Sequence, residues 1–344
     1  MLEARAEFRA RPLNNGACVK TVINYEAETP GLTLRHTGIL RLMKTLPDFT
    51  IVIPTHRRPT LLPRAVEGAL AACGATGEVV VVADNDPGAA ESLFSFVEEP
   101  RLRLVDNPGP HGASAARNCG IAAARGQVIL FLDDDDDMVA DYPARVMAVA
   151  KAGRASWGFS RHFTRNSFDA APELAPRKKR RQGQIQRSVP FKRNTAGTSN
   201  GFWVKRDLCL DVGGFCPDLR LDEDTDLCCR LVAAGHQPWY EELPGTILNR
   251  VGTIQRLTNS GADRSYAECY VKVLQRNAGA LRDVPGAVSF LASRAQHKML
   301  RAGMGGSLDM VYREVASPWL RLVLRTERVL WERKRAKAGL AKAI

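Results

Sequence analysis

The 344-residue sequence predicts an α/β fold, in which a mostly parallel central sheet carries helices on both faces and a helical extension follows it. Its apolar runs are continuous rather than alternating, as in residues 79–82, and such runs are typical of strands buried on both faces of a parallel sheet. These runs alternate with amphipathic segments of helical length, which is the order of an α/β domain. From about Ser265 onward the pattern is helical, with breaks near Pro285, residues 303–306 and Pro318.

The regular elements begin at Phe49. Short apolar runs predict strands, and segments with one apolar side predict helices. Gly126 follows the third predicted helix at the position where glycine commonly ends a helix. We expect strands over 50–54, 78–83, 101–105, 128–132, 155–162 and 201–204, and helices over 60–72, 89–97, 112–124, 142–151 and 225–234. Residues 165–195 are polar and basic, and we expect them to form a mobile connection.

Composition narrows the class of protein. The formal net charge is +12, and eight basic residues without an acid lie in 177–193. The eight cysteines form no CxxC pair, and Cys73, Cys119, Cys228 and Cys229 fall in apolar helical patterns, so a reduced cytosolic compartment is the simplest interpretation. No apolar run approaches the roughly 18–20 residues that a membrane span needs, and the N-terminus lacks an apolar signal core.

Five consecutive aspartates, residues 133–137, follow the predicted buried strand 128–132 directly. Such a concentration of negative charge is unfavourable unless a cation lies beside it. Oxygen ligands without a neighbouring His or Cys suit a hard divalent ion such as Mg²⁺ or Mn²⁺. Ligands of open α/β sheets bind at the carboxyl ends of strands, so a metal site holding a phosphate-bearing substrate is expected here. The alternative is a solvated acidic turn.

Four motifs, in order, resemble the family 2 glycosyltransferases, which have the Rossmann-like type A glycosyltransferase fold. The resemblance covers about residues 49–244. It is carried by FTIVIPTHRRPTLLPRAV, VVVVADNDP, ASAARNCGIAAARGQVILFLDDDDD and GGFCPDLRLDEDTDLCCRLVAAG. The family implies a nucleotide diphosphate sugar as donor, a UDP-sugar first and a dTDP-sugar second, and a hydroxyl of a glycan or lipid-linked acceptor.

The resemblance implies roles on the donor side. Asp133 and Asp135 match the family's metal-binding pair, with Asp135 as the main ligand of Mn²⁺ or Mg²⁺, and Asp134 or Asp136 could hold the ribose or the sugar. Asp137 is expected to be solvated or to cap a helix. The remaining expected nucleotide-sugar contacts are Pro54, Thr55, Asp84 and Arg117, with Arg58 and His111 as weaker candidates for which a plain loop residue is the alternative. For Asp84, a plain turn residue is the alternative.

A second acidic cluster, Asp222-Glu223-Asp224, offers a carboxylate for the acceptor. The resemblance implies that Asp224 is the base that deprotonates the attacking hydroxyl, with Glu223 or Asp222 second. The alternative is that Asp224 caps the helix predicted over 225–234. Inversion at the transferred carbon follows from the family and from a single displacement that uses one base.

Other classes fit less well. A haloacid-type phosphohydrolase needs a Thr two residues after its second Asp, where this chain has Asp137, and a nucleotidyltransferase needs a Gly-rich loop that IPTHRRP lacks. A degenerate family member that only binds nucleotide sugars is a further alternative. A nucleic-acid partner is not expected, because the basic stretches contain few aromatic residues. Processive synthases carry QxxRW, and Gln255-Arg256 does not continue into it, so one sugar per encounter is expected.

We therefore expect three parts: a poorly ordered leader over 1–46, a catalytic domain over 47–255, and a helical extension over 256–344. Residues 320–344 hold eight basic and two acidic residues, 8 − 2 = +6, with two tryptophans nearby. This basic amphipathic segment either lies on an anionic membrane or packs on the catalytic domain. The expected location is the cytoplasm, peripheral to the inner face of the membrane, in bacterial cell-surface glycan synthesis.

Overall fold

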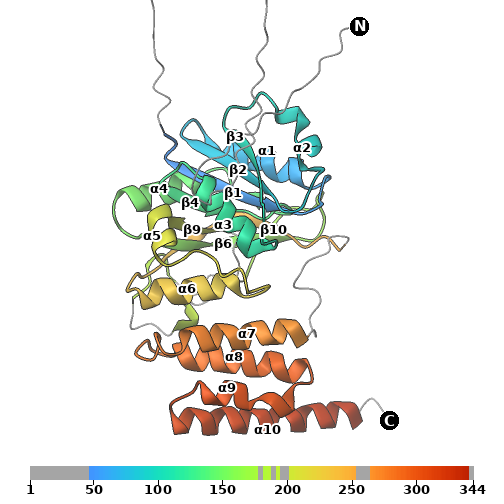
Figure 1. Ribbon diagram of the computed structural model, residues 1–344, viewed down its shortest axis with the longest axis vertical. Helices are drawn as coiled ribbons and strands as arrows, with labels where there is room; N and C mark the ends of the chain where they lie inside the picture. The colour runs from blue at the N-terminus through green and yellow to red at the C-terminus, as the bar shows by residue number, and fades with distance from the viewer. Residues whose placement is uncertain (1–45, 177–180, 187–190, 194–200, 253–263, 341–344) are drawn as a thin grey trace, which may run out of the picture.

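The computed structural model describes residues 46–176, 181–186, 191–193, 201–252 and 264–340. The expected leader over 1–46 and the domain boundary near 255 therefore lie almost wholly outside the described residues. Figure 1 shows a sheet-containing part followed by a stack of helices. In that stack α6 lies next to the sheet, and α7, α8 and α10 follow one beyond another.

The central sheet is mixed, and its strands run in the order β3-β2-β1-β4-β9-β6-β10-β5. The half formed by β3, β2, β1 and β4 is parallel throughout, and β10 pairs in parallel with β6. Strand β9 is antiparallel to both β4 and β6, so the two parallel portions are joined through it. The strands are β1 (Phe49–Thr55), β2 (Gly77–Ala83), β3 (Leu102–Asp106), β4 (Val128–Phe131), β5 (Asp137–Met138), β6 (Trp157–Arg165), β7 (Glu173–Leu174), β8 (Gly183–Gln184), β9 (Phe202–Lys205) and β10 (Trp239–Asn249).

Helices cover both faces of the sheet, as the continuous apolar runs predict. Alternate residues of β1 point to opposite faces: Val52 packs in one buried cluster with α3, and Ile51 and Ile53 pack in another with α1 and α4. The helices are α1 (Leu62–Cys73), α2 (Ala89–Ser92), α3 (Ala113–Ala123), α4 (Tyr142–Lys151), α5 (Arg206–Asp211), α6 (Glu223–Ala233), α7 (Arg264–Asn277), α8 (Ala287–Arg301), α9 (Asp309–Arg313) and α10 (Pro318–Leu340).

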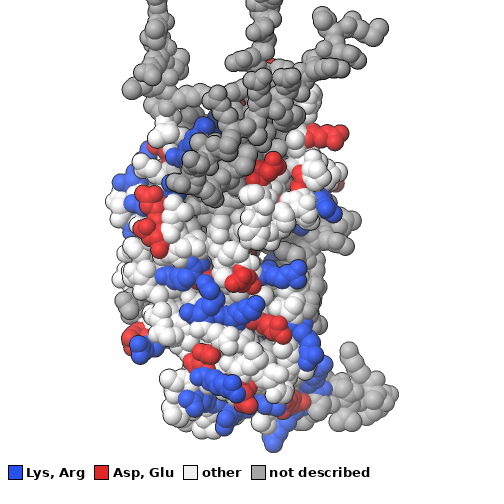
Figure 2. Space-filling model, in the orientation of Figure 1, with Lys and Arg blue, Asp and Glu red and all other residues white. Residues whose placement is uncertain are grey.

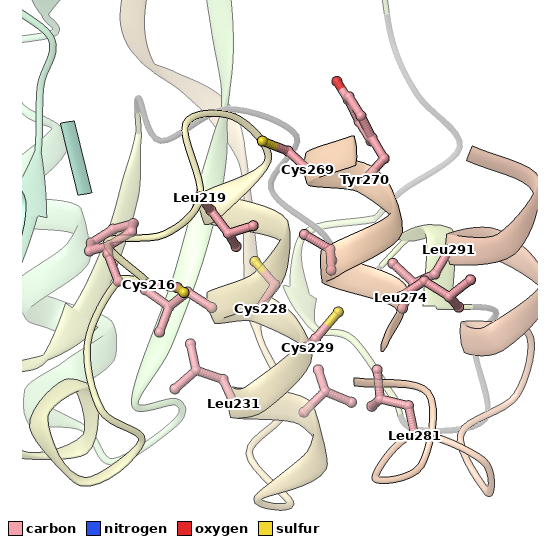
Figure 3. Close-up of a cluster of buried hydrophobic side chains, with 14 of the residues drawn as sticks. Cys216, Leu219, Cys228, Cys229, Leu231, Cys269, Tyr270, Leu274, Leu281 and Leu291 are labelled. Carbon is pink, nitrogen blue, oxygen red and sulfur yellow. The ribbon is translucent and has the colours of Figure 1, made fainter. Parts of the chain in front are cut away.

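The C-terminal helices share one core with the sheet-containing part. A single apolar cluster extends from Val52 on β1 through α6 to Leu324 on α10. Figure 3 shows its middle, where Cys229 of α6 points toward α7, which carries Leu274, and Leu231 points to the opposite side of α6. The seven described cysteines are free and buried, as the apolar pattern around four of them predicts. The expected extension is thus helical, and it is continuous with the core of the sheet.

Several predicted elements differ from the observed ones. The predicted helix over 89–97 is only the four-residue α2 followed by a 3₁₀ turn, Phe94–Phe96. Strand β10 was absent from the prediction, because Pro244-Gly245 reads as a turn; in the structure these residues lie where the pairing of β10 with β6 shifts register. The described residues of 165–195 include two short strands, β7 and β8, each paired to the sheet.

Helix α3 lies unusually close to the sheet. A Cβ added at Gly120 would lie 2.3 Å from Cγ1 of Val52, so only glycine permits this approach. Helix α3 consists largely of small residues, and Arg117 in the same helix contacts Asp133, which follows β4.

We therefore expect Gly120→Ala to lower the free energy of unfolding by about 1–3 kcal/mol, the usual cost of overpacking. Gly68→Ala is the matched control, since Gly68 lies in α1 with no atom within 4 Å of the added carbon. There the same substitution is expected to stabilise by roughly 0.5–1 kcal/mol. Urea denaturation of the two variants measures both values, and equal effects would contradict the close packing of α3.

Candidate active site

The site lies where β1, β2 and β4 end. Thr55 ends β1, Asp84 follows β2, and the aspartates 133–137 follow β4 after one further residue. Because these strands are parallel neighbours, their carboxyl ends place the three segments along one edge of the sheet.

Asp133, Asp135 and Asp136 form a group of three carboxylates that fits a hard cation. One oxygen from each lies within 4.8 Å of the others. Asp135 and Asp136 are buried, and Asp133 is partly exposed. Three convergent carboxylate oxygens without His or Cys are the donor set that Mg²⁺ and Mn²⁺ prefer. The sequence pointed to Asp133 and Asp135, and the structure adds Asp136 to them.

Asp134 points toward the loop that follows β1. Its oxygens accept hydrogen bonds from Thr55 Oγ1 (2.8 Å) and Arg58 NH1 (2.9 Å), and the same Arg58 nitrogen lies 2.9 Å from Oδ2 of Asp135. Burial raises the pKa of Asp134 to about 6, against the opposing effect of Arg58. Thr55 and Arg58 thus lie beside the acidic group, where they connect the end of β1 to it, and their expected contact with the nucleotide stays a prediction. Pro54, one residue earlier in β1, is partly buried.

Asp137 differs from expectation. It neither lies free in solvent nor caps a helix. Its carboxylate accepts from Nε of Arg64 (3.0 Å) and Nδ2 of Asn249 (3.1 Å), and it pairs with Arg165. Its side chain is only 14% exposed, so an unpaired charge would be costly here, and two guanidinium groups compensate it.

Asp84 is held by the loops around it. Oδ1 accepts from Nδ2 of Asn107 (2.8 Å) and lies 2.9 Å from Nδ1 of His111, and Oδ2 accepts from the backbone N–H of Gly112 (2.7 Å). These contacts fix the entry into α3. The expected contact of Asp84 with a nucleobase stays a prediction.

Arg117 connects the two acidic clusters. It is buried in α3, and its NH2 donates to Oδ1 of Asp133 while its NH1 donates to Oε1 of Glu223, both at 2.8 Å. One guanidinium group therefore holds Asp133, which follows β4, close to Glu223 in the first turn of α6. The expectation placed Arg117 against the nucleotide, whereas in the structure its donors contact protein carboxylates.

The acids of α6 differ in their environments. Glu223 is mostly buried, and burial raises its pKa, whereas Arg117 opposes that rise. Asp224 is partly exposed, and its Oδ1 accepts from the backbone N–H of Thr225 at 2.6 Å. No described residue hydrogen-bonds to its Oδ2.

The alternative that Asp224 is the N-cap of the following helix is wrong, because α6 begins at Glu223 and its N-cap residue is Asp222. Asp222 has a left-handed backbone, φ 64°, and its side chain makes no N-cap hydrogen bond. Its Oδ1 accepts instead from Thr225 Oγ1 (2.8 Å) and from Arg294 of α8 (2.6 Å).

Sequence reasoning missed Asn249, at the end of β10. Its backbone N–H donates to Oδ1 of Asp136 (2.7 Å), and its Nδ2 donates to the carbonyl of Asp135 (2.8 Å). It could not be found because β10 itself was not predicted. Arg294 was missed because nothing local in α8 indicates what it contacts.

Comparisons with known proteins agree with this fold. Residues 50–212 match the family described as Glycosyl transferase family 2. The succinoglycan biosynthesis protein ExoO of Rhizobium meliloti is 30% identical over 226 residues, which cover 62% of this chain. That alignment covers 64% of ExoO, so the chain spans a little under two thirds of this relative's length.

Two solved structures share the fold. The Staphylococcus aureus TarS fragment 1–349 in complex with UDP-GlcNAc aligns with a TM-score of 0.57 at 14% identity, covering 74% of this chain and 72% of that one. The mannosyltransferase PcManGT from Pyrobaculum calidifontis, in complex with GDP-Man and Mn²⁺, aligns with a TM-score of 0.51 at 16% identity, covering 83% and 81%. Over residues 50–212 the chain therefore matches glycosyltransferase family 2, and it has the type A glycosyltransferase fold.

The ion pair between Arg117 and Glu223 can be tested by measuring the free energy of unfolding. Arg117→Gln removes the partner of a mostly buried carboxylate, and breaking such a pair costs about 3–5 kcal/mol. Without the guanidinium, the pKa of Glu223 in the folded chain rises further above its unfolded value. The loss of stability is therefore expected to be small below the ordinary pKa of glutamate and to grow as pH rises through the raised one.

Urea denaturation between pH 4.5 and 8 measures this trend. Adding Glu223→Gln to the variant is expected to restore a substantial part of the stability at pH 8 and to flatten the pH dependence. A loss that is independent of pH, or no rescue by the second substitution, would contradict the ion pair.

Proposed function

We propose that this chain is a metal-dependent, inverting glycosyltransferase that moves one sugar per encounter from a nucleotide diphosphate sugar, a UDP-sugar first, to a hydroxyl acceptor. The supporting observation is that Arg117 holds together two acidic groups of different character. One is a set of three carboxylates suited to a divalent cation, and the other ends in Asp224, whose Oδ2 accepts no hydrogen bond from the residues that the structure describes. Bacterial cell-surface glycan synthesis is the proposed pathway class, and the similarity to ExoO supports it.

The donor side is assigned to the strand ends. Asp133, Asp135 and Asp136 would hold Mn²⁺ or Mg²⁺, and a bound divalent ion supplies stabilisation of the charge that builds on the leaving diphosphate. Pro54, Thr55 and Arg58 follow β1 at the same edge, and Asp84 follows β2, so we assign the nucleotide to this edge. Asp134, which binds Thr55 and Arg58, acts by holding that loop in place.

The acceptor side is assigned to α6. Asp224 takes the proton of the acceptor hydroxyl, the oxygen attacks the anomeric carbon, and the bond from that carbon to the diphosphate breaks. A single displacement of this kind inverts the configuration. Glu223 is less suited to the role, because its Oε1 is occupied by Arg117 and its side chain is only 13% exposed.

The first experiment is a donor screen, in which UDP, dTDP and GDP release is recorded from each nucleotide sugar with Mn²⁺. Within it, Asp135→Ala is expected to weaken Mn²⁺-dependent UDP binding and to remove transfer. Asp224→Asn is expected to lower turnover about 10²-fold with UDP affinity unchanged. Asp218→Asn, an exposed acid ahead of α6, is the control and should keep full activity.

Calorimetry of UDP binding and a transfer assay, both made on the same preparations, test the donor-side and the acceptor-side assignments separately. If Asp135→Ala kept more than about a tenth of the wild-type turnover, the loss would be under ~1.4 kcal/mol and the metal assignment would be wrong. If Asp224→Asn lost stability but kept its turnover, Asp224 would be structural.

We also propose that α10 holds the protein against an anionic membrane surface. Among the described residues, no helix is long and apolar enough to cross a membrane. One side of α10 packs on α8, where Leu324 is buried and its carbonyl accepts from Gln296. The other side exposes an apolar stripe at helical spacing: Trp319, Leu322, Val329 and Leu330.

Cations accompany the exposed stripe. Arg325, Arg333, Lys334 and Arg335 of α10 are exposed, and Figure 2 shows Lys and Arg side chains gathered at the level of α10 on the face in view. Apolar side chains beside cations are the pattern of helices that lie in the interface of anionic bilayers. One side of this segment thus packs on α8, and we assign the membrane contact to the other side. The basic stretch 177–193 lies largely outside the described residues.

Flotation of the full chain with phosphatidylglycerol vesicles tests this contact. The wild type is expected to float with anionic vesicles and to stay below with phosphatidylcholine vesicles. Replacing Trp319, Leu322 and Val329 by Ser should reduce flotation about tenfold or more, because the apolar contact is lost. Leu243→Ser, at an exposed leucine outside α10, is the control.

Substitution is preferable to deleting α10, since deletion would uncover the side that packs on α8. Equal flotation with both lipids, or unchanged flotation of the triple variant, would contradict the membrane contact.

A further inference from the structure

The C-terminal helices reach the acidic residues of the proposed acceptor side. Arg294 of α8 donates from NH2 to Oδ1 of Asp222 at 2.6 Å, and Asp222 immediately precedes Glu223 and Asp224. Burial raises the pKa of Asp222 to about 6, and the nearby Asp224 adds to that rise, whereas Arg294 opposes it. The site is therefore bounded by α8 on the side of Asp222.

Arg294 is held in place by aromatic rings. Its guanidinium carbon lies 5.1 Å from the ring centroid of Tyr270 on α7 and 5.8 Å from that of Phe290. Figure 3 shows the hydroxyl of Tyr270 pointing away from the buried cluster. Only part of the donor capacity of Arg294 is used, since its Nε is buried without a hydrogen-bond partner among the described residues.

Two further cations continue this row along α8. Lys298 lies one turn after Arg294, with Nζ 4.9 Å from the same Tyr270 ring, and Arg301 follows at the end of the helix. The spacing of i, i+4 and i+7 places all three on one side of the helix, over about 10 Å. Neither Lys298 nor Arg301 forms an ion pair with a described residue, and Lys298 is half-buried.

This arrangement is unfavourable without an anion. The pKa of Lys298 is lowered by burial and by the positive charges of Arg294 and Arg301, with only Asp222 opposing. Three cations on one side of a helix repel one another, and the carboxylate of Asp222, which opposes the lowered pKa of Lys298, is already bound to Arg294. The row thus has the charge of an anion site at a position next to Asp224.

We propose that Arg294, Lys298 and Arg301 bind a phosphate or diphosphate group on the acceptor. The inference rests on the proposed function, since Asp224 marks where the acceptor hydroxyl lies. A guanidinium offers paired donors and a lysine ammonium a compact charge, and both suit phosphate oxygens. An acceptor that presents its hydroxyl at Asp224 and its phosphate at Lys298 would be oriented by these two contacts. The acceptor class is therefore a phosphorylated sugar or glycan rather than a neutral one.

The test uses the full chain saturated with UDP and Mg²⁺, so that the donor side is filled, and inorganic pyrophosphate as the probe in calorimetry. Lys298→Gln is expected to weaken pyrophosphate binding about tenfold, which corresponds to ~1.4 kcal/mol. Lys298→Arg should retain most of the affinity. Lys272→Gln, which removes an exposed lysine from α7, is the matched control and should bind like the wild type.

A second measurement separates the two sources of phosphate. If the site serves the acceptor, Lys298→Gln floats with phosphatidylglycerol vesicles as the wild type does. Loss of flotation together with loss of pyrophosphate binding would instead assign the row to phospholipid headgroups and overturn the proposal. It is equally overturned if the UDP-loaded wild type binds no pyrophosphate at millimolar concentration, or if Lys298→Gln binds it unchanged.

A failure of this inference can be told apart from a failure of the proposed function. UDP titration in the presence of Mn²⁺ reads the donor side directly, and Lys298→Gln is expected to bind UDP like the wild type. A chain that binds no UDP lacks the donor side, whatever pyrophosphate does, so the two failures are distinguishable.

Discussion

Negative charge concentrated at one edge of the sheet is the constraint on which the rest of this structure depends. Eight carboxylates, residues 133–137 and 222–224, lie in two short segments, and most of them are buried or nearly so. Burying that much charge is unfavourable unless each group has a partner. The partners are arginines from five separate parts of the chain: Arg58 after β1, Arg64 in α1, Arg117 in α3, Arg165 in β6 and Arg294 in α8.

This distribution has a consequence for the fold. Each arginine fixes its own element against the acidic edge, so the site can form only when segments more than two hundred residues apart have come together. Arg117 is central because it contacts both acidic segments from one buried position. The close approach of α3 to β1 at Gly120 is what allows an arginine to reach that position from a helix.

The distribution also separates the acids by chemistry. Asp134 and Asp137 are bound by arginines and shape the site. Asp133, Asp135 and Asp136 converge as a candidate metal group, in which Asp133 also pairs with Arg117 and Asp135 with Arg58, and Asp224 is the proposed base. Neighbouring residues of the same type thus have different roles, because each faces a different element. The shared core that extends from β1 to α10 places the C-terminal helices at the same site, where α8 supplies Arg294.

The sequence by itself determined the α/β order, the strands β1, β2 and β4, the position of α4, the helical C-terminal part and the two acidic clusters. These follow from local patterns: continuous apolar runs, helical periodicity and runs of one residue type. Only the tertiary structure decided the antiparallel β9 in the middle of the sheet, the strand β10 across Pro244-Gly245, and the partners of each aspartate. Strand pairing and buried ion pairs join residues far apart in the chain, so no local pattern encodes them. For that reason the sequence could not predict that Asn249, Arg294 and the ion pairs of Asp137 belong to the site.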